Sequence, residues 1–211
     1  MGASALPYPP PFFRWFPAAL GAACVLTLSA CGSDEKGHDP PASATSIDDR
    51  AFRERIEDIQ SAVTDWESAE SIGEAQAAAE TAANLVVGPG GPGYGDRDGD
   101  GTIGGDVDVG LLSGIDGAPV GVAVDLAANP CVTRDVLGAT VDDPAAGWAE
   151  MNAAIDAWRP DDNTMPTLAS HPMRVVGWST FTLASDDLDE AHEYAGHAQL
   201  HVDVSREALD C

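Results

Sequence analysis

Hydrophobic positions along most of this chain recur with the spacing of an α-helix. Early in this pattern the apolar side chains lie three and four residues apart, which places them in one stripe along an amphipathic helix. The stripe consists of Phe52, Ile56, Ile59, Val63 and Trp66. Ser46 followed by Asp49 has the character of a capping arrangement. We therefore predict a first helix that begins near Ser46.

A second helix is predicted from Ser71 to Gly88. Ser71 and Glu74 have the spacing of a capping box, in which each residue satisfies a free backbone amide of the first turn. Gly88 followed by Pro89 is typical of a helix end. The face of this helix is nearly all alanine, which favours the helical state and allows a neighbouring helix to approach closely.

Three further helices are predicted in the C-terminal half. Asp143-Pro144 places a cap before a first-turn proline, and Pro160 ends that helix. Its stripe is Trp148, Met151, Ile155 and Trp158. The segment after Pro172 is rich in β-branched and aromatic residues, yet it also matches a helical face, so we interpret it as helix. A last helix over about 186–209 has the apolar seam Leu188, Ala191, Ala195, Ala198, Val202 and Leu209.

The remaining segments connect these helices. Residues 88–119 are rich in glycine and proline, and a loop of that length is usually functional or disordered. Residues 119–142 fit either a strand or a short helix. No alternation of strands and helices and no internal repeat is present. The sequence thus predicts an all-α fold, a small bundle of four to five helices in one domain over 47–211, with a long Gly/Asp-rich loop at 88–118.

The chain is strongly acidic. Among its 211 residues, Lys+Arg number 10 and Asp+Glu number 35, which gives a formal net charge of -25. Such a charge repels nucleic acid phosphates, so we expect no nucleic acid partner. It suits cations, basic partners or simply a well-solvated surface.

The first thirty residues have the character of an export signal. Arg14 precedes an apolar run from Trp15 to Ala30 that is shorter than the roughly 20 residues needed to span a bilayer. The run ends in Leu28-Ser29-Ala30-Cys31, which resembles the lipobox of bacterial lipoproteins. That resemblance implies cleavage before Cys31 and lipidation of Cys31. The alternatives are an uncleaved short anchor and cleavage without lipid.

The lipobox resemblance also implies a division of the N-terminal region. Residues 1–30 would be a signal peptide, and 31–46 would be the lipidated cysteine with a flexible, polar tether. The protein would then reside in the bacterial cell envelope, anchored in a membrane by lipid on its extracytoplasmic side.

Two cysteines remain outside the signal and the lipidation site. In an oxidising compartment, Cys131 and Cys211 most simply form a disulfide, and the alternative is two free thiols. A bridge would fasten the C-terminus to the middle of the chain.

A cluster of aspartates within residues 94–108 resembles the calcium loop of EF-hand and dockerin-type proteins. Asp96, Asp98 and Asp100 occupy the first, third and fifth positions of D-x-D-x-D-G-x-I, and Gly101 would allow the sharp turn. Calcium takes six to eight oxygen ligands, so alternating carboxylates on a curved chain suit it. The resemblance implies that Thr102 offers its backbone carbonyl and that Ile103 anchors the loop on apolar surface.

The cluster departs from the family pattern at the end of the loop. Val107 stands where the family has an acidic ligand, and Asp106 and Asp108 flank it. Either could close the site, and the sequence that follows is a poor second helix. We therefore expect a lone structural calcium site, with calcium as the cofactor. The alternative is a disordered acidic turn.

A second candidate metal site lies on the last predicted helix. His197 and His201 are four residues apart and share a helical face, with Glu193 one turn earlier. The spacing after His192 is one residue too long for the H-E-x-x-H motif of zinc proteases. Three or four converging ligands are needed for a zinc site, so a solvated polar helix face is the simpler interpretation.

The sequence gives weak support for an enzyme. "GWSTF" has Phe181 where the nucleophile elbow of hydrolases has glycine, and no alternating strands and helices accompany it. We expect a non-catalytic interaction or structural module with a protein partner. The alternatives are a lipoprotein that binds or delivers zinc or copper, and an envelope hydrolase without a recognisable motif.

Overall fold

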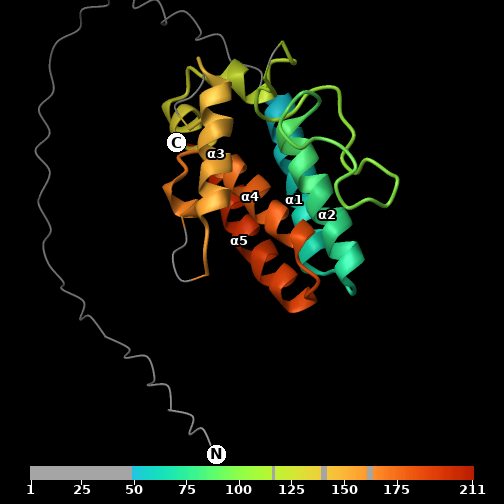
Figure 1. The fold of residues 1–211 in the computed structure, drawn as a ribbon. Coiled ribbons are helices and arrows are strands. Elements are labelled where there is room, and N and C mark those ends of the chain that lie inside the picture. The colour runs from blue at the N-terminus through green and yellow to red at the C-terminus, as the bar shows by residue number, and fades with distance from the viewer. Residues whose placement is uncertain (1–48, 116, 139–141, 161–163) are drawn as a thin grey trace, which may run out of the picture. The chain divides into compact units, whose positions relative to one another are not determined.

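Four long helices form a bundle in the computed structural model, which describes residues 49–115, 117–138, 142–160 and 164–211 (Figure 1). α1 (Arg50–Glu67) and α2 (Ile72–Val87) form one antiparallel pair, and α4 (His171–Ala184) and α5 (Leu188–Glu207) form the other. α2 packs on α4 and α1 packs on α5, which closes the ring. The described residues contain no strand, so the predicted all-α bundle is confirmed.

The predicted apolar stripes form the core of this bundle. Every member of the α1 stripe is at most 3% exposed. The seam of α5 is buried from Ala191 to Val202, and its two ends, Leu188 and Leu209, are partly buried. Buried alanines of α2 bring its backbone close to α1 and α4: Ala75, Ala79, Ala82 and Ala83.

The helix ends differ in detail from the prediction. α1 begins at Arg50, and Ser46 lies outside the described residues. Asp49 precedes α1 without capping its backbone amides, because its carboxylate accepts a hydrogen bond from Arg53 Nε at 2.8 Å. The Ser71 hydroxyl caps α2 by accepting from Glu74 N at 3.3 Å. Glu74 reaches back to Glu70 N at 2.9 Å, so the capping box is displaced by one residue.

α3 (Pro144–Ala157) packs against α4 outside the four-helix ring. The Asp143 carboxylate caps it as predicted, by accepting from Ala146 N at 3.0 Å. Short helical turns occupy the ambiguous 119–142 segment and the approach to α4: η1 (Val122–Leu126), η2 (Val132–Val136) and η3 (Met165–Thr167). Residues 139–141 of that segment lie outside the described residues.

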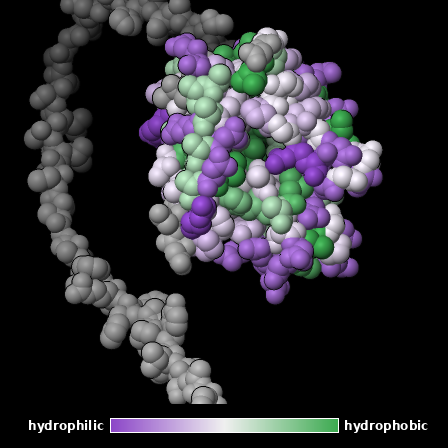
Figure 2. Space-filling view, viewed as in Figure 1, coloured by the Kyte–Doolittle hydropathy of each residue, from purple (hydrophilic) through white to green (hydrophobic). Residues whose placement is uncertain are grey.

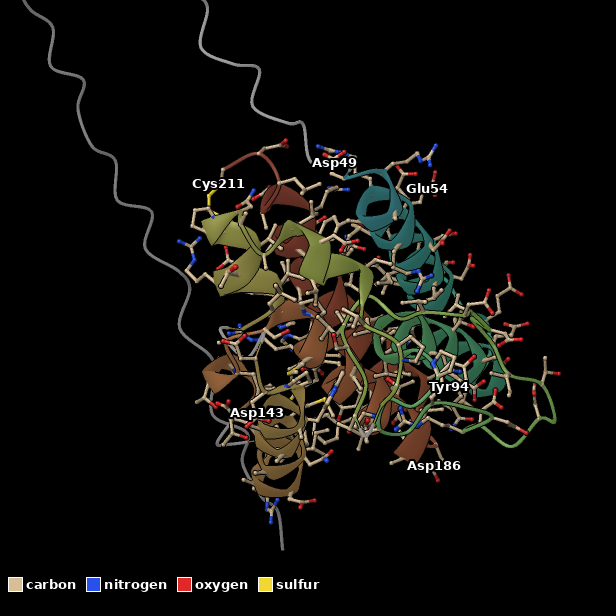
Figure 3. The ribbon with its side chains drawn as sticks, turned by 90° about the horizontal axis from the view of Figure 1, so that it is seen from above. Asp49, Glu54, Tyr94, Asp143, Asp186 and Cys211 are labelled. Atoms are coloured by element: carbon tan, nitrogen blue, oxygen red, sulfur yellow. A yellow bond between two sulfur atoms is a disulfide. The ribbon has the colours of Figure 1, made fainter. Side chains whose placement is uncertain are left out.

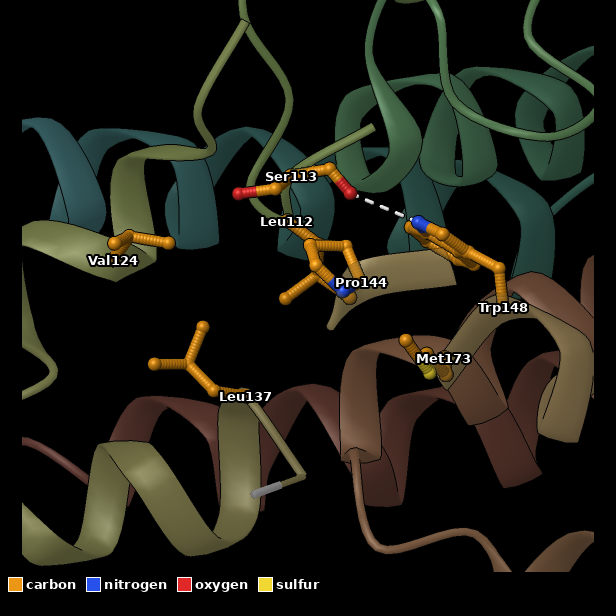
Figure 4. Close-up of a pocket in the computed structure, with 7 residues that line it drawn as sticks. All are labelled: Leu112, Ser113, Val124, Leu137, Pro144, Trp148 and Met173. Carbon is orange, nitrogen blue, oxygen red and sulfur yellow. Dashed lines mark hydrogen bonds between the residues drawn. The ribbon is translucent and has the colours of Figure 1, made fainter. Parts of the chain in front are cut away.

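A small apolar gap lies where α3, α4 and the two short turns meet the end of the long loop (Figure 4). It measures about 20 Å³, which is close to the space of one water molecule. Trp148 lines it and donates its indole N–H to the Ser113 carbonyl at 2.9 Å. This hydrogen bond fastens α3 to the segment that follows the aspartates.

The long loop runs from the end of α2 to η1 and lies along α2 (Figure 1). Its far end is fastened to α2, because Leu111 N and Leu112 N donate to the carbonyls of Leu85 and Val86, each at 3.0 Å. Gly88 and Gly110 permit this approach. A Cβ on Gly88 would lie 2.2 Å from Gly110 N. The face of the molecule in Figure 2 carries hydrophilic residues interspersed with hydrophobic ones.

Candidate metal site on the second helix

Two buried polar residues of α2 support the aspartate loop. Glu80 is 1% exposed and Asn84 is fully buried. They are four residues apart and therefore lie on one face of the helix. Most of α2 around them is alanine, leucine and valine, and Thr81 follows Glu80 directly. Two polar side chains on the core side of such a helix require polar partners, and the loop provides them.

The Glu80 carboxylate accepts three backbone amides of the loop. Oε2 accepts from Arg97 N and from Asp98 N, the latter at 3.0 Å, and Oε1 accepts from Gly104 N at 2.8 Å. Backbone amides stabilise a buried carboxylate, since each supplies a partial positive charge. Glu80 thereby joins the beginning and the end of the aspartate turn.

Asn84, one helical turn after Glu80, forms a second set of hydrogen bonds to the same loop. Its amide nitrogen donates to the carbonyls of Gly95 and Gly104, at 3.1 and 2.7 Å, and its oxygen accepts from Gly95 N at 3.1 Å. Gly104 passes so close to the helix that a Cβ there would lie 2.4 Å from Thr81 Oγ1. The loop is thus seated directly on α2.

The aspartates themselves curl the turn. Asp96 accepts from Gly99 N at 2.8 Å through one carboxylate oxygen and from Gly101 N at 3.0 Å through the other. Asp98 accepts from Asp100 N at 3.0 Å, and Asp100 accepts from Thr102 N at 2.7 Å. Such bonds from a side chain to a backbone amide two or more residues ahead are typical of Asx turns.

This arrangement brings three carboxylates together. Ligand oxygens of Glu80, Asp96 and Asp98 all lie within 4.8 Å of one another, so the group could hold a metal ion. Among the described residues it is the one group of three or more acidic, histidine or cysteine ligands with that spacing. Partial burial raises the pKa of Asp98, and the negative charges of Glu80, Asp100 and Asp96 raise it further. A cation between the carboxylates would reverse that repulsion.

The other predicted ligands lie around this group and not within it. Asp100 and Thr102 are exposed. Asp106 accepts a hydrogen bond from the Tyr94 hydroxyl at 2.6 Å, and Figure 3 shows Tyr94 in the loop beside α2. Ile103 was expected to anchor the loop, but its side chain is 42% exposed. Asp100, Thr102, Asp106 and Asp108 remain predicted ligands.

Sequence reasoning missed Glu80. It lies 16 residues before the first aspartate of the motif, outside the pattern of a calcium loop. A signal was nevertheless present, because Glu80 and Asn84 are polar residues at helical spacing within an otherwise apolar segment. Charged residues are seldom fully buried without a partner, so that pair indicated a polar partner packed on α2.

Arg97 connects the loop to α4. Its guanidinium donates to Thr180 Oγ1 at 2.9 Å. Burial lowers the pKa of Arg97, and the charge of Glu80 opposes that effect. The side chain therefore extends from the acidic turn across to the neighbouring helix.

The candidate ligands on the histidine-rich helix α5 do not converge on one point. Glu193 Oε1 lies 4.0 Å from His197 Nε2, whereas His201 Nδ1 lies 3.1 Å from His171 Nδ1 of α4. The predicted trio of Glu193, His197 and His201 is not brought together as one group of ligands, and it stays a prediction. His192 Nε2 lies 2.9 Å from the Ala69 carbonyl oxygen, which ties α5 to the α1–α2 turn.

The two remaining cysteines lie at disulfide distance. The Cα atoms of Cys131 and Cys211 are 6.2 Å apart, and Figure 3 shows the sulfur atoms joined beside η2. The lipobox, including Cys31, lies outside the described residues, as does the whole predicted tether.

Comparisons with known proteins identify no relative of this chain. No family model matches the chain, and neither a curated protein nor a solved structure matches it. Within the part of the chain that the structure describes, every helix is too short or too polar to cross a membrane.

Proposed function

We propose that this protein is an exported, lipid-anchored component of the bacterial cell envelope whose helical domain is stabilised by a calcium ion. The calcium-binding part of this proposal rests on the position of Glu80. A carboxylate that is 1% exposed faces Asp96 and Asp98, with ligand oxygens of all three within 4.8 Å. Three negative charges this close repel one another, and a divalent cation is the simplest way to offset that repulsion.

The choice of calcium rests on the chemistry of the ligands and on the motif. All three groups are carboxylates, which suit hard cations, whereas zinc and copper sites usually include histidine or cysteine. The D-x-D-x-D-G order adds backbone carbonyls and further aspartates nearby. The backbone amides that already fix these carboxylates hold the loop in place before an ion arrives.

The anchoring half of the proposal rests on the sequence alone. An apolar run that ends in Leu28-Ser29-Ala30-Cys31 supports export and lipidation of Cys31. The polar segment 32–46 would then separate the domain from the membrane. Within that arrangement the domain acts as a non-catalytic interaction or structural module with a protein partner.

Calcium titration combined with thermal unfolding tests the calcium-binding part. With the dissociation constant of about 10⁻⁴–10⁻³ M typical of extracellular calcium modules, 10 mM calcium would stabilise the fold by about 1.4–2.7 kcal/mol. For a domain of this size the midpoint of unfolding would rise by about 3–10 °C. Calorimetry should show one calcium per chain, and equimolar magnesium should stabilise the fold less.

Glu80→Gln is the decisive variant, because it retains the shape of the side chain and removes one charge. We expect the calcium-dependent rise to be lost or strongly reduced in Glu80→Gln and kept in the control Glu54→Gln. Glu54 lies on α1 with a side chain that is 68% exposed. An unchanged calcium response in Glu80→Gln would exclude this site.

Lipidation is tested separately. The mature protein should begin at Cys31, partition into detergent and carry acyl groups by mass spectrometry of its N-terminal peptide. Cys31→Ser should abolish all three properties. A Cys31→Ser protein that still partitions into detergent with an acylated N-terminus would contradict the lipobox interpretation.

A further inference from the structure

A pocket on the other side of α4 and α5 is built from aromatic rings and acidic side chains. It measures about 150 Å³ and lies between the end of α3, the middle of α4 and the first half of α5. Trp158, Trp178 and Tyr194 line it together with Glu190 and Glu193. The pocket shares no residue with the acidic group on α2.

The aromatic rings stand in two nearly perpendicular planes. Trp158 makes an angle of 84° with both Trp178 and Tyr194, with ring centroids 6.1 Å apart in each pair. Trp178 and Tyr194 are 25° from parallel, with centroids 5.5 Å apart. The imidazole of His197 stacks on Trp178, with ring centroids 4.4 Å apart and planes 14° from parallel, and covers part of that ring. The remaining ring surfaces form a corner, and aromatic corners recognise alkylated cations through the negative potential of the ring faces.

The carboxylates of the pocket strengthen that preference. Glu190 is fixed in place, because it accepts hydrogen bonds from the Tyr194 hydroxyl at 2.8 Å and from the Ser185 hydroxyl at 2.5 Å. Glu193 is 73% exposed at the rim. Among the described residues its one ion-pair partner is His197, whose Nε2 lies 4.0 Å from the Glu193 carboxylate. Among the residues that the structure describes, neither lysine nor arginine lines the pocket. Its electrostatic potential is therefore negative both from the ring faces and from the carboxylates.

The same features disfavour an inorganic ion. Glu190, Glu193 and His197 do not form a group whose ligand atoms lie within 4.8 Å of one another. A small, strongly hydrated ion gains most from close oxygen ligands, whereas a large, weakly hydrated cation gains from ring faces.

We propose that this pocket binds a methylated ammonium headgroup of the choline type, with Trp158, Trp178 and Tyr194 against the methyl groups and Glu190 and Glu193 balancing the charge. The headgroup belongs either to a free small molecule or to a phosphocholine lipid. This inference does not depend on calcium or on the lipid anchor.

Choline and its neutral isostere 3,3-dimethyl-1-butanol provide a matched pair of probes. The full-length chain in a maltoside detergent, which carries no cation of its own, is titrated with each while tryptophan fluorescence and heat are recorded. Choline should bind saturably and about fivefold or more tightly than the isostere, because only choline gains the cation–π and carboxylate interactions. Equal affinity for the two compounds would overturn the proposal.

Variants locate the binding site. Glu190→Gln with Glu193→Gln, and separately Trp158→Leu, should each weaken choline binding about fivefold or more, whereas the exposed Glu207→Gln on the same helix should leave it unchanged. Unchanged binding in the carboxylate pair, with an unchanged melting temperature, would also overturn the proposal. If Trp158→Leu does not fold, the carboxylate pair alone decides.

One further probe distinguishes the sources of the headgroup, and a second tests the role of the indole N–H groups. Monomeric short-chain phosphatidylcholine that binds more tightly than choline would assign the site to a lipid, and equal or weaker binding would assign it to a free cation. Either result supports a site for the shared headgroup. Glycine betaine tests whether an acceptor adds affinity, since the buried indole N–H groups of Trp158 and Trp178 have no hydrogen-bond partner in the described structure.

Discussion

Glu80 makes two kinds of contact in the acidic group on α2. Its carboxylate organises the loop through three backbone amides, and it also faces Asp96 and Asp98. The first kind of contact needs no ion, because the amides satisfy part of the carboxylate's hydrogen-bonding capacity. The loop is consequently held in a binding-ready shape, which reduces the entropy that an ion would have to overcome.

The aspartates of this site could be predicted from the sequence, whereas the sequence marks Glu80 only as a polar residue in a mostly apolar helix and not as their partner. Asp96 and Asp98 belong to a local pattern of alternating aspartates, and that pattern by itself indicates a cation site. Glu80 lies beside them only because the loop folds back onto α2. This contact between distant segments cannot be predicted from the spacing of residues along the chain. The exposed position of Ile103 has the same cause, since Leu111 and Leu112 take the anchoring role that the motif assigns to Ile103.

Single elements were predicted more completely than the contacts between them. The 3.6-residue spacing of apolar positions identified each long helix, including α4, whose β-branched and aromatic residues also suited a strand. Burial in the bundle overrides that propensity. The pairing of His171 with His201 was not foreseen, because it depends on how the start of α4 crosses the latter part of α5.

That pairing makes the contact between α4 and α5 sensitive to pH. Burial, together with the charges of Arg174, His171 and His197, lowers the pKa of His201 to about 3. Burial and Arg174 also lower the pKa of His171, while Asp135 opposes the shift. The His201 ring therefore stays neutral in the folded state at mildly acidic pH, when the unfolded chain already binds protons.

The sign of the pH effect follows from this difference. An unfolded histidine titrates near 6.5, so the stability contributed by neutral His201 is complete above that pH and is lost as the pH falls toward 3. The loss amounts to at most about 1.4 kcal/mol per pH unit. Denaturant unfolding in chelator at pH 6.5 and 5.5 should show a larger loss in the wild type than in His201→Gln. His197→Gln, on the same helix, should retain the wild-type slope, and equal slopes in all three proteins would contradict the assignment.

At the scale of the whole molecule, the chain is closed at its C-terminal end by Cys131 and Cys211. These residues are 80 positions apart, and the segment between them contains α3, α4 and α5. A cross-link over that length restricts the unfolded chain far more than the folded one. The chain-entropy treatment gives a stabilisation of about 4.5 kcal/mol as the upper limit.

Reduction should therefore lower the midpoint of unfolding by up to about 9–18 °C. The double variant Cys131→Ser with Cys211→Ser should melt at the temperature of the reduced wild type and should not respond to reductant. The calcium-dependent rise should persist in both, because the acidic group on α2 lies outside the segment that the two cysteines enclose. A wild type that melts equally with and without reductant would show that the two thiols are free. The end of α5 would then be held to η2 by packing alone.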